Sequence, residues 1–167
     1  MAIDYLRESE KYRPETIKTL LVGEAPPPSE GSYFYVPRAM SNNLPIRIDR
    51  SLPATIFFHY FQTRPVTKDE YIDLLLKLQQ KGVFLIDIFD EPLRIRGKNG
   101  IIKENLDRII DQIPKLRNKI TSRNISIKDR DTIFLLPRSH YLKHLEREFP
   151  NATYVKWIDF RLSPEPF

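Results

Sequence analysis

The fold is decided by a stretch near the N-terminus that reads Leu20-Leu21-Val22-Gly23-Glu24-Ala25-Pro26-Pro27-Pro28-Ser29-Glu30-Gly31. The apolar run from Ile17 to Val22 is stopped by a glycine and then by three prolines, which predicts a buried strand followed by a loop. In open α/β sheets, ligands bind in the crevice beyond the carboxyl ends of the strands. Glu24 therefore lies where a site is expected, although a rigid turn whose glutamate faces water explains the loop equally well.

The composition is that of one globular domain without sulfur ligands. The 167 residues are 41% apolar and 29% charged, which predicts a single domain over residues 1–167. The chain has no cysteine, which excludes disulfides, zinc–thiolate sites and cysteine-bound iron–sulfur clusters. We find no apolar run that could span a bilayer and no secretory signal, so we expect a cytoplasmic protein. The formal net charge of +5 permits a polyanionic partner without demanding one.

Apolar runs alternate with helical patterns along the chain. The clearest helix, 67–81, begins with a capping box from Thr67 to Glu70 and is followed by Gly82. Strands are predicted at 17–22, 83–89, 131–137 and 152–157, and further helices at 101–113, 115–121 and 138–149. This alternation predicts a three-layer α/β/α fold with a mostly parallel four-stranded central sheet, whose strands all end at one edge.

Two aromatic segments are ambiguous. Residues 54–61 are apolar without alternation and fit a buried helix or a strand; within them, His59 is expected to be a hydrogen-bonded buried histidine rather than a metal ligand. Adjacent aromatics at 33–35 cannot all face a core, so at least one is expected to project into the crevice or solvent. In the alternative arrangement, Phe34 packs inward while the two tyrosines cover the edge of the sheet.

Several polar and charged residues are candidates for a site or for a structural role. Asp87 lies in an apolar run, and an unpaired buried carboxylate is costly and tends to take up a proton. A cap or ion pair with a neighbouring loop and a ligand-facing role both remain open for it.

His140 and His144 share one helix face, but we see no third ligand nearby and predict no metal and no cofactor. The basic loop at 94–98 fits either phosphate binding or simple solvation.

The order of these features resembles the uracil-DNA glycosylase superfamily. Gly23-Glu24-Ala25-Pro26 after the first strand, followed by Gly31 and an aromatic cluster, is similar to the first motif of its iron–sulfur branch. Asp87 falls where the superfamily has a base-reading polar residue, and Leu162-Ser163-Pro164 falls where it has a His-Pro-Ser type loop. The chain departs from that branch in three ways: Pro27 replaces a glycine, cysteines are absent, and the third loop lacks histidine.

The resemblance implies roles for individual residues. Glu24 would orient a water molecule near the sugar, and Arg161 would supply positive charge in place of the missing histidine. Phe34 would stack on an extruded base, while Asp87 and Tyr33 would contact the same base. As an ionised carboxylate, Asp87 would favour a base edge rich in hydrogen-bond donors. The residues assigned to the nucleic-acid backbone are Ser163, Arg138, Arg94, Arg96 and Lys98.

These observations predict a uracil-DNA glycosylase-like protein. It would bind a flipped base in nucleic acid, in DNA rather than RNA, with hydrolysis of the N-glycosidic bond as its candidate reaction. One alternative is a catalytically inactive nucleic-acid-binding or accessory protein of the same fold. Another is a small α/β protein that binds a free nucleotide or sugar phosphate through the loop at 94–98. The sequence indicates no membrane partner and leaves the oligomeric state open.

Overall fold

The central feature of the computed structural model is a four-stranded, all-parallel sheet with the order β2-β1-β3-β4. The structure describes residues 3–27, 33–37, 51–93, 103–136, 141–156 and 160, with the backbone alone described at 103–105. The strands are β1 (Thr19–Gly23), β2 (Val83–Asp87), β3 (Thr132–Leu136) and β4 (Thr153–Lys156). The parallel pairing confirms the predicted sheet and brings the carboxyl ends of its strands to one edge.

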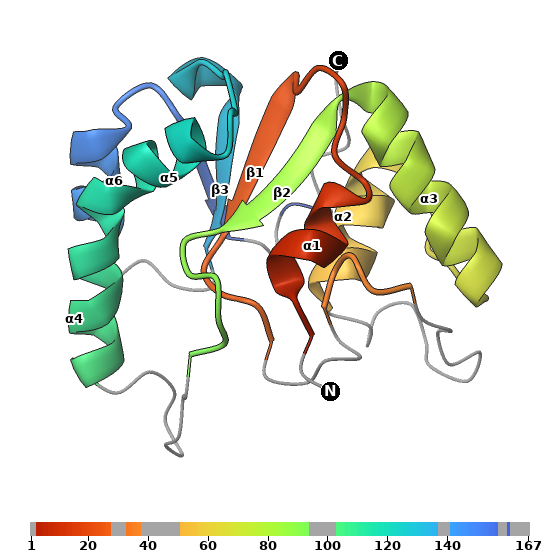
Figure 1. Cartoon of the computed structure of the whole chain (residues 1–167), viewed down its shortest axis with the longest axis horizontal. Coiled ribbons are helices and arrows are strands. Elements are labelled where there is room, and N and C mark those ends of the chain that lie inside the picture. The colour runs from red at the N-terminus through yellow and green to blue at the C-terminus, as the bar shows by residue number, and fades with distance from the viewer. Residues whose placement is uncertain are drawn as a thin grey trace.

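Helices cover the sheet from both sides. Figure 1 shows α2 and α3 on one side, and α4, α5 and α6 on the other. The helices are α1 (Tyr5–Glu10), α2 (Leu52–Phe61), α3 (Lys68–Lys81), α4 (Lys103–Gln112), α5 (Leu116–Ser122) and α6 (Leu142–Glu148), with short 3-10 turns η2 (Ile113–Lys115) and η3 (Asp129–Asp131). The predicted alternation of strands and helices is confirmed, and the ambiguous segment at 54–61 is helical. None of the described helices has the length and apolar character needed to cross a bilayer.

The helix α3 has the ends that its sequence predicts. The side chain of Thr67 accepts a hydrogen bond from the N–H of Glu70, and the Glu70 carboxylate accepts one from the N–H of Thr67, both at 3.2 Å. Gly82 ends the helix with φ at +79°. A Cβ at this position would also lie 2.9 Å from the carbonyl oxygen of Thr16, so both conformation and close approach require glycine.

A tyrosine satisfies the free edge of the sheet. Because β2 is an edge strand, some of its backbone N–H and C=O groups point away from the sheet. The hydroxyl of Tyr35 accepts a hydrogen bond from the N–H of Leu85 at 2.7 Å and donates one to its C=O at 3.1 Å. Burial raises the pKa of Tyr35 well above its ordinary value, which keeps the hydroxyl protonated. This one side chain therefore pairs with both backbone groups of Leu85.

The expectation that one of Tyr33, Phe34 and Tyr35 projects outward is wrong. All three are buried, with exposed fractions of 6%, 4% and 3%. The segment forms a turn in which the N–H of Val36 bonds to the C=O of Tyr33 at 3.0 Å, so the alternation of a strand does not apply. The Tyr33 hydroxyl donates to the C=O of Tyr5 at 3.2 Å. Hydrogen bonds to the backbone thus allow both tyrosines to lie in the core.

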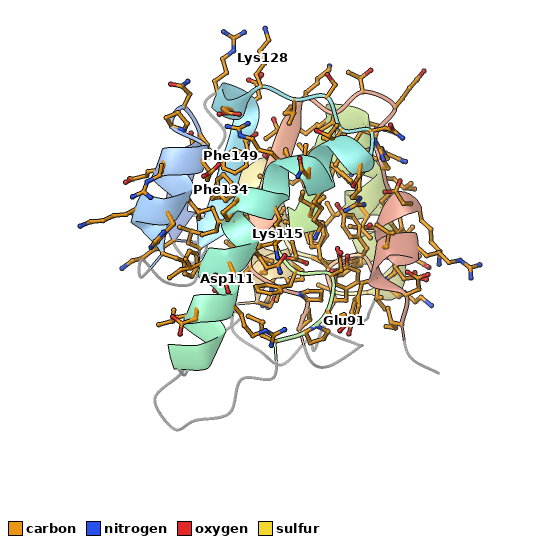
Figure 2. The ribbon with its side chains drawn as sticks, turned by 60° about the vertical axis from the view of Figure 1, so that its left-hand side comes forward. Glu91, Asp111, Lys115, Lys128, Phe134 and Phe149 are labelled. Carbon is orange, nitrogen blue, oxygen red and sulfur yellow. The ribbon has the colours of Figure 1, made fainter. Side chains whose placement is uncertain are left out.

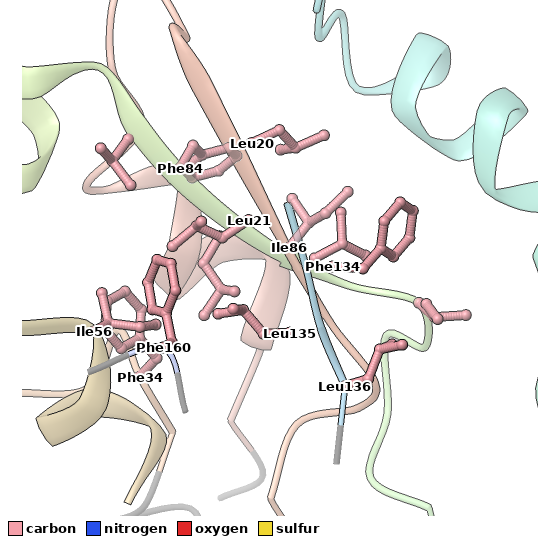
Figure 3. Packing of buried hydrophobic residues seen from close by; sticks show 14 of the residues in the cluster. Leu20, Leu21, Phe34, Ile56, Phe84, Ile86, Phe134, Leu135, Leu136 and Phe160 are labelled. Carbon is pink, nitrogen blue, oxygen red and sulfur yellow. The ribbon is translucent and has the colours of Figure 1, made fainter. Parts of the chain in front are cut away.

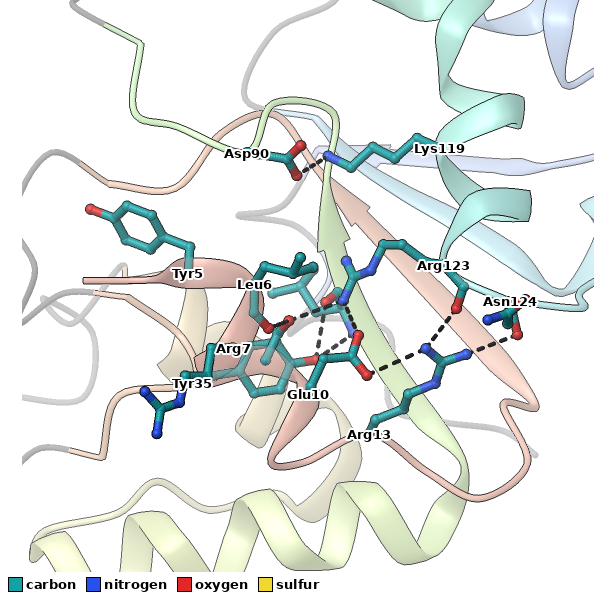
Figure 4. Close-up of polar contacts among 12 residues, drawn as sticks. Tyr5, Leu6, Arg7, Glu10, Arg13, Tyr35, Asp90, Lys119, Arg123 and Asn124 are labelled. Atoms are coloured by element: carbon teal, nitrogen blue, oxygen red, sulfur yellow. Dashed lines mark hydrogen bonds and ion pairs between the residues drawn. The ribbon is translucent and has the colours of Figure 1, made fainter. Parts of the chain in front are cut away.

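Two arginines attach the N-terminal segment to the edge of the sheet (Figure 4). Arg123, which follows α5, pairs with Glu10 at 2.6 Å, and Arg13 donates to two carbonyls at the end of α5 at 2.7 and 2.8 Å. The two guanidinium groups lie 5.3 and 5.9 Å from the centroid of the Phe84 ring. These contacts join α1 to both β2 and α5.

The core on the α2 side of the sheet contains several buried aromatics. The ring of Phe34 packs against Phe57, with centroids 5.6 Å apart, and both belong to the buried hydrophobic cluster, part of which is drawn in Figure 3. His59 is buried, its Nδ1 lies 2.8 Å from the carbonyl oxygen of Phe160, and its ring stacks on that residue at 3.7 Å. The prediction of a hydrogen-bonded buried histidine is therefore confirmed.

The pairing of Tyr35 with the edge strand leads to a stability prediction. In Tyr35→Phe, the N–H and C=O of Leu85 would lose their partner inside the core, so we expect the free energy of unfolding to fall by about 1–3 kcal/mol. Urea unfolding followed by circular dichroism measures the change. Tyr12→Phe is the matched control, because this ring stacks on Tyr35 and its hydroxyl makes no hydrogen bond within the described ranges. Equal losses in the two variants would contradict the assignment.

Candidate functional site

The sheet has a topological switch point between β1 and β3. The chain leaves β1 to form β2 on one side and later crosses to form β3 on the other. Ligands of open α/β sheets bind outside the carboxyl ends of the strands at such a point. Glu24 follows β1 directly, and Tyr141 lies at the start of α6, after β3. The two residues therefore approach the switch point from its two sides.

A short hydrogen bond joins these residues. The hydroxyl of Tyr141 donates to Oε2 of Glu24 at 2.5 Å, a length typical of a bond from a hydroxyl group to a carboxylate. Tyr141 is fully buried, whereas Glu24 is half-buried. The backbone of Glu24 is also held, because its C=O accepts from the N–H of Phe89 at 3.1 Å. Both main chain and side chain of Glu24 are therefore fixed at the edge of the sheet.

The side chain of Asp87 lies against the backbone of β1. Asp87 is the last residue of β2 and is the register partner of Gly23 in the parallel pair. A Cβ built on Gly23 would lie only 2.4 Å from Oδ1 of Asp87. The carboxyl group thus occupies space that only glycine leaves open, next to Glu24. This close approach gives a physical reason for the glycine in the Gly23-Glu24 motif.

The ionised form of Asp87 is unfavourable in this buried environment. Burial raises its pKa to about 7; the Lys119 charge opposes this shift, while Asp90 and Glu24 add to it. Only 9% of the residue is exposed, and its carboxyl group accepts no hydrogen bond from any residue that the structure describes. Its ionisation therefore reduces the stability of the fold at neutral pH. Carboxyl groups kept at such a cost are typical of functional sites.

Lys119 supplies the positive charge at the end of β2. From α5, its Nζ donates to the carbonyl oxygens of Asp87 and Ile88 at 2.6 and 3.2 Å. The same atom forms an ion pair with Oδ1 of Asp90 at 2.6 Å (Figure 4). The ion pair considered for Asp87 is therefore made by Asp90 instead. The carboxyl group of Asp87 interacts with the ammonium group of Lys119 only electrostatically, without a hydrogen bond.

The structure brings together some of the predicted site residues. Glu24, directly after β1, and Asp87, at the end of the neighbouring β2, lie at the carboxyl edge and influence each other electrostatically. Tyr33 and Phe34 lie in the core, and their contact with a base stays a prediction. The remaining candidates lie outside the described residues: Arg161, Ser163, Arg138, Arg94, Arg96 and Lys98, together with His140.

Sequence analysis missed two residues of this site. Lys119 is one of several basic residues in the predicted helix at 115–121, and nothing in its spacing distinguishes it. Tyr141 follows the third strand, as Glu24 follows the first. Its position after that strand could have predicted that it lies at the same sheet edge as Glu24. The arrangement that results is chemically asymmetric. Glu24 is an oriented carboxylate, whereas Asp87 is a buried carboxyl group that exchanges its proton near neutral pH.

No protein-family model, curated protein or solved structure matches the chain. Membership of the uracil-DNA glycosylase superfamily therefore stays a prediction from the sequence. Among the described residues, we find no group of three or more histidine, aspartate or glutamate side chains that could hold a metal ion.

The buried Asp87 carboxyl leads to a prediction about pH. Its pKa is raised from 3.8 to about 7, so the wild-type protein loses stability as the pH rises through this interval. Asp87→Asn removes the ionisation and should therefore become progressively more stable than wild type, by on the order of 4 kcal/mol above neutral pH. Urea unfolding from about pH 4 to about pH 8 measures the difference. Asp73→Asn, an exposed residue of α3, should follow the wild-type pH profile; a constant gap for Asp87→Asn would contradict the prediction.

The contact between Gly23 and Asp87 leads to a second stability prediction. Gly23→Ala would force its new methyl group onto the Asp87 carboxyl, so we expect a loss of about 1–3 kcal/mol. In an Asp87→Ala background the obstructing atoms are gone, and the same substitution should cost less than half as much. A double-mutant cycle of unfolding free energies tests this coupling. Additive effects would show that the clash is relieved elsewhere.

Proposed function

We propose that this protein binds a nucleobase at the carboxyl edge of its sheet and hydrolyses the N-glycosidic bond of that nucleotide in nucleic acid. The observation that carries the proposal is the Glu24 carboxylate, held at the switch point by Tyr141 and flanked by the buried carboxyl of Asp87. The resemblance of the Gly23-Glu24-Ala25-Pro26 motif to the uracil-DNA glycosylase superfamily supplies the type of reaction.

The reaction needs a fixed carboxylate near the sugar. As the bond between base and sugar breaks, its electron pair goes to the base and positive charge develops on the sugar ring. A carboxylate balances that charge, and it orients the attacking water and accepts its proton. Glu24 has the properties this role demands, because a buried hydroxyl holds its side chain and its backbone is tied to the neighbouring loop. Orientation of this kind lowers the barrier by avoiding rearrangement during the reaction.

Asp87 is suited to recognising the edge of the base. With a pKa of about 7, it is present at neutral pH both as a carboxylic acid, which donates a hydrogen bond, and as a carboxylate, which only accepts. The sequence-based expectation considered only the ionised form and therefore only donor-rich edges. The protonated form extends the candidate bases to those that present a carbonyl oxygen, such as uracil and hypoxanthine.

The proposal is tested by measuring release of free base from oligonucleotides that contain uracil or hypoxanthine. We expect release by the wild-type protein and a loss of about 100-fold or more in Glu24→Gln, since general-base and charge-balancing contributions are of this size. Tyr141→Phe keeps the carboxylate but removes the hydrogen bond that orients it, so its rate should fall between those of the wild type and Glu24→Gln. Single-turnover rates on each oligonucleotide provide the measurement.

Glu15→Gln is the matched control for charge, because Glu15 is exposed and lies away from the sheet edge. Its rate should equal that of the wild type. Absence of base release by the wild-type protein, or an unchanged rate in Glu24→Gln, would overturn hydrolysis at this site. Retained binding of the oligonucleotides without release would then favour an inactive nucleic-acid-binding protein of the same fold.

A further inference from the structure

A groove lies beside the loop that follows β2. Its volume is about 520 Å³, within the range of small-molecule sites. One wall is the segment 88–91, and the other is a single face of the stretch from α4 to α5 (Figure 2). The helical wall consists of Arg108, Gln112, Lys115, Leu116, Lys119 and Ser122. Spacings of three and four residues keep these side chains on one face, although the turn η2 separates the two helices.

The helical wall carries two positive charges that no described side chain neutralises. Lys119 is occupied by its ion pair with Asp90. Arg108 and Lys115, in contrast, make no hydrogen bond and no ion pair with any other described residue. The guanidinium carbon of Arg108 lies 5.6 Å from the centroid of the Phe89 ring, a contact that uses the ring face and leaves the N–H groups available. The wall therefore offers a pre-positioned anion-binding group.

The loop wall has the opposite character. Glu91 is exposed and, within the described part of the chain, forms no ion pair with the cations across the groove. Apolar surface in the groove comes mainly from the half-buried ring of Phe89 on the loop, because Ile88 and Leu116 are almost fully buried beneath it. A simple anion would meet the repulsion of Glu91, whereas a ligand that combines an anionic group with N–H donors would satisfy both walls.

We infer that this groove binds a nucleotide unit. Its phosphate would contact Arg108 and Lys115, its base would lie over the apolar surface, and N–H groups of the base would donate to Glu91. The unit could come from a free nucleotide or from a nucleic-acid strand, since both present the same chemistry. This site uses none of the residues assigned to the proposed hydrolysis, so it stands independently of that function.

The inference is tested with adenosine 5′-monophosphate and inorganic phosphate by calorimetry, and with a labelled single-stranded oligoadenylate by fluorescence anisotropy. The wild-type protein should bind the nucleotide more tightly than phosphate. Arg108→Gln combined with Lys115→Gln should weaken nucleotide binding by about tenfold or more, because it removes charge-assisted hydrogen bonds. Glu91→Gln should weaken nucleotide binding, because it weakens the acceptor for the N–H groups of the base, and should strengthen phosphate binding, because it removes a repulsive charge.

The double variant Lys77→Gln with Arg130→Gln is the matched control, because it removes the same charge from exposed positions outside the groove. It should bind like the wild type. An equal loss in this control, phosphate binding as tight as nucleotide binding, or no binding of nucleotide and oligonucleotide at millimolar concentration would each overturn the inference.

The two sources of the nucleotide are separated by the oligonucleotide. Binding that weakens steeply with salt, with a smaller salt slope in the Arg108 and Lys115 double variant, supports a strand. Binding of the mononucleotide alone supports a free nucleotide. Glu15→Gln, which is exposed and outside the groove, should leave both affinities unchanged. Base release and nucleotide binding are separate measurements, so failure of the proposed hydrolysis and failure of this inference are distinguishable.

Discussion

The carboxyl edge of the sheet depends on the contact between Asp87 and the backbone of Gly23. Parallel pairing sets these two residues side by side, and the missing side chain of glycine gives the carboxyl group its place. The same pairing removes that group from water, because β2 is buried along its whole length. The strand pairing that builds the fold therefore also makes ionisation of the Asp87 carboxyl group unfavourable. A carboxyl group in this environment takes up a proton more readily than an exposed aspartate does.

Lys119 limits the cost of gathering acidic groups at this edge. Glu24, Asp87 and Asp90 interact through their charges, and the ammonium group lies against two carbonyl oxygens and one of these carboxylates. Because it comes from α5, it also fixes the loop after β2 relative to the helical layer. One side of that loop faces the site at the sheet edge, and the other forms a wall of the groove. The two regions thus share a support while using different side chains.

Local sequence signals predicted what local interactions determine. The capping box at Thr67 and the glycine at 82 define α3 through contacts within a few residues, and apolar runs bounded by turn residues define the parallel strands. Burial of Tyr35 could not be predicted in this way, because it depends on Leu85, fifty positions along the chain. Lys119 likewise acquires its role only when α5 packs beside β2. The burial of Tyr35 and the role of Lys119 were missed because in both cases the partner of the polar group is distant in sequence, whereas His59 was predicted correctly from its apolar neighbours.

Two buried tyrosines make hydrogen bonds of different kinds. The hydroxyl of Tyr35 pairs with backbone groups of an edge strand that would otherwise be unsatisfied in the core, so the fold itself requires this bond. The hydroxyl of Tyr141 is used on Glu24, a half-buried residue whose carboxylate water could also solvate. Such a bond also restricts where the carboxylate points. The bond orients the carboxylate. A group that acts on a ligand requires such orientation, whereas a glutamate that only faces water does not.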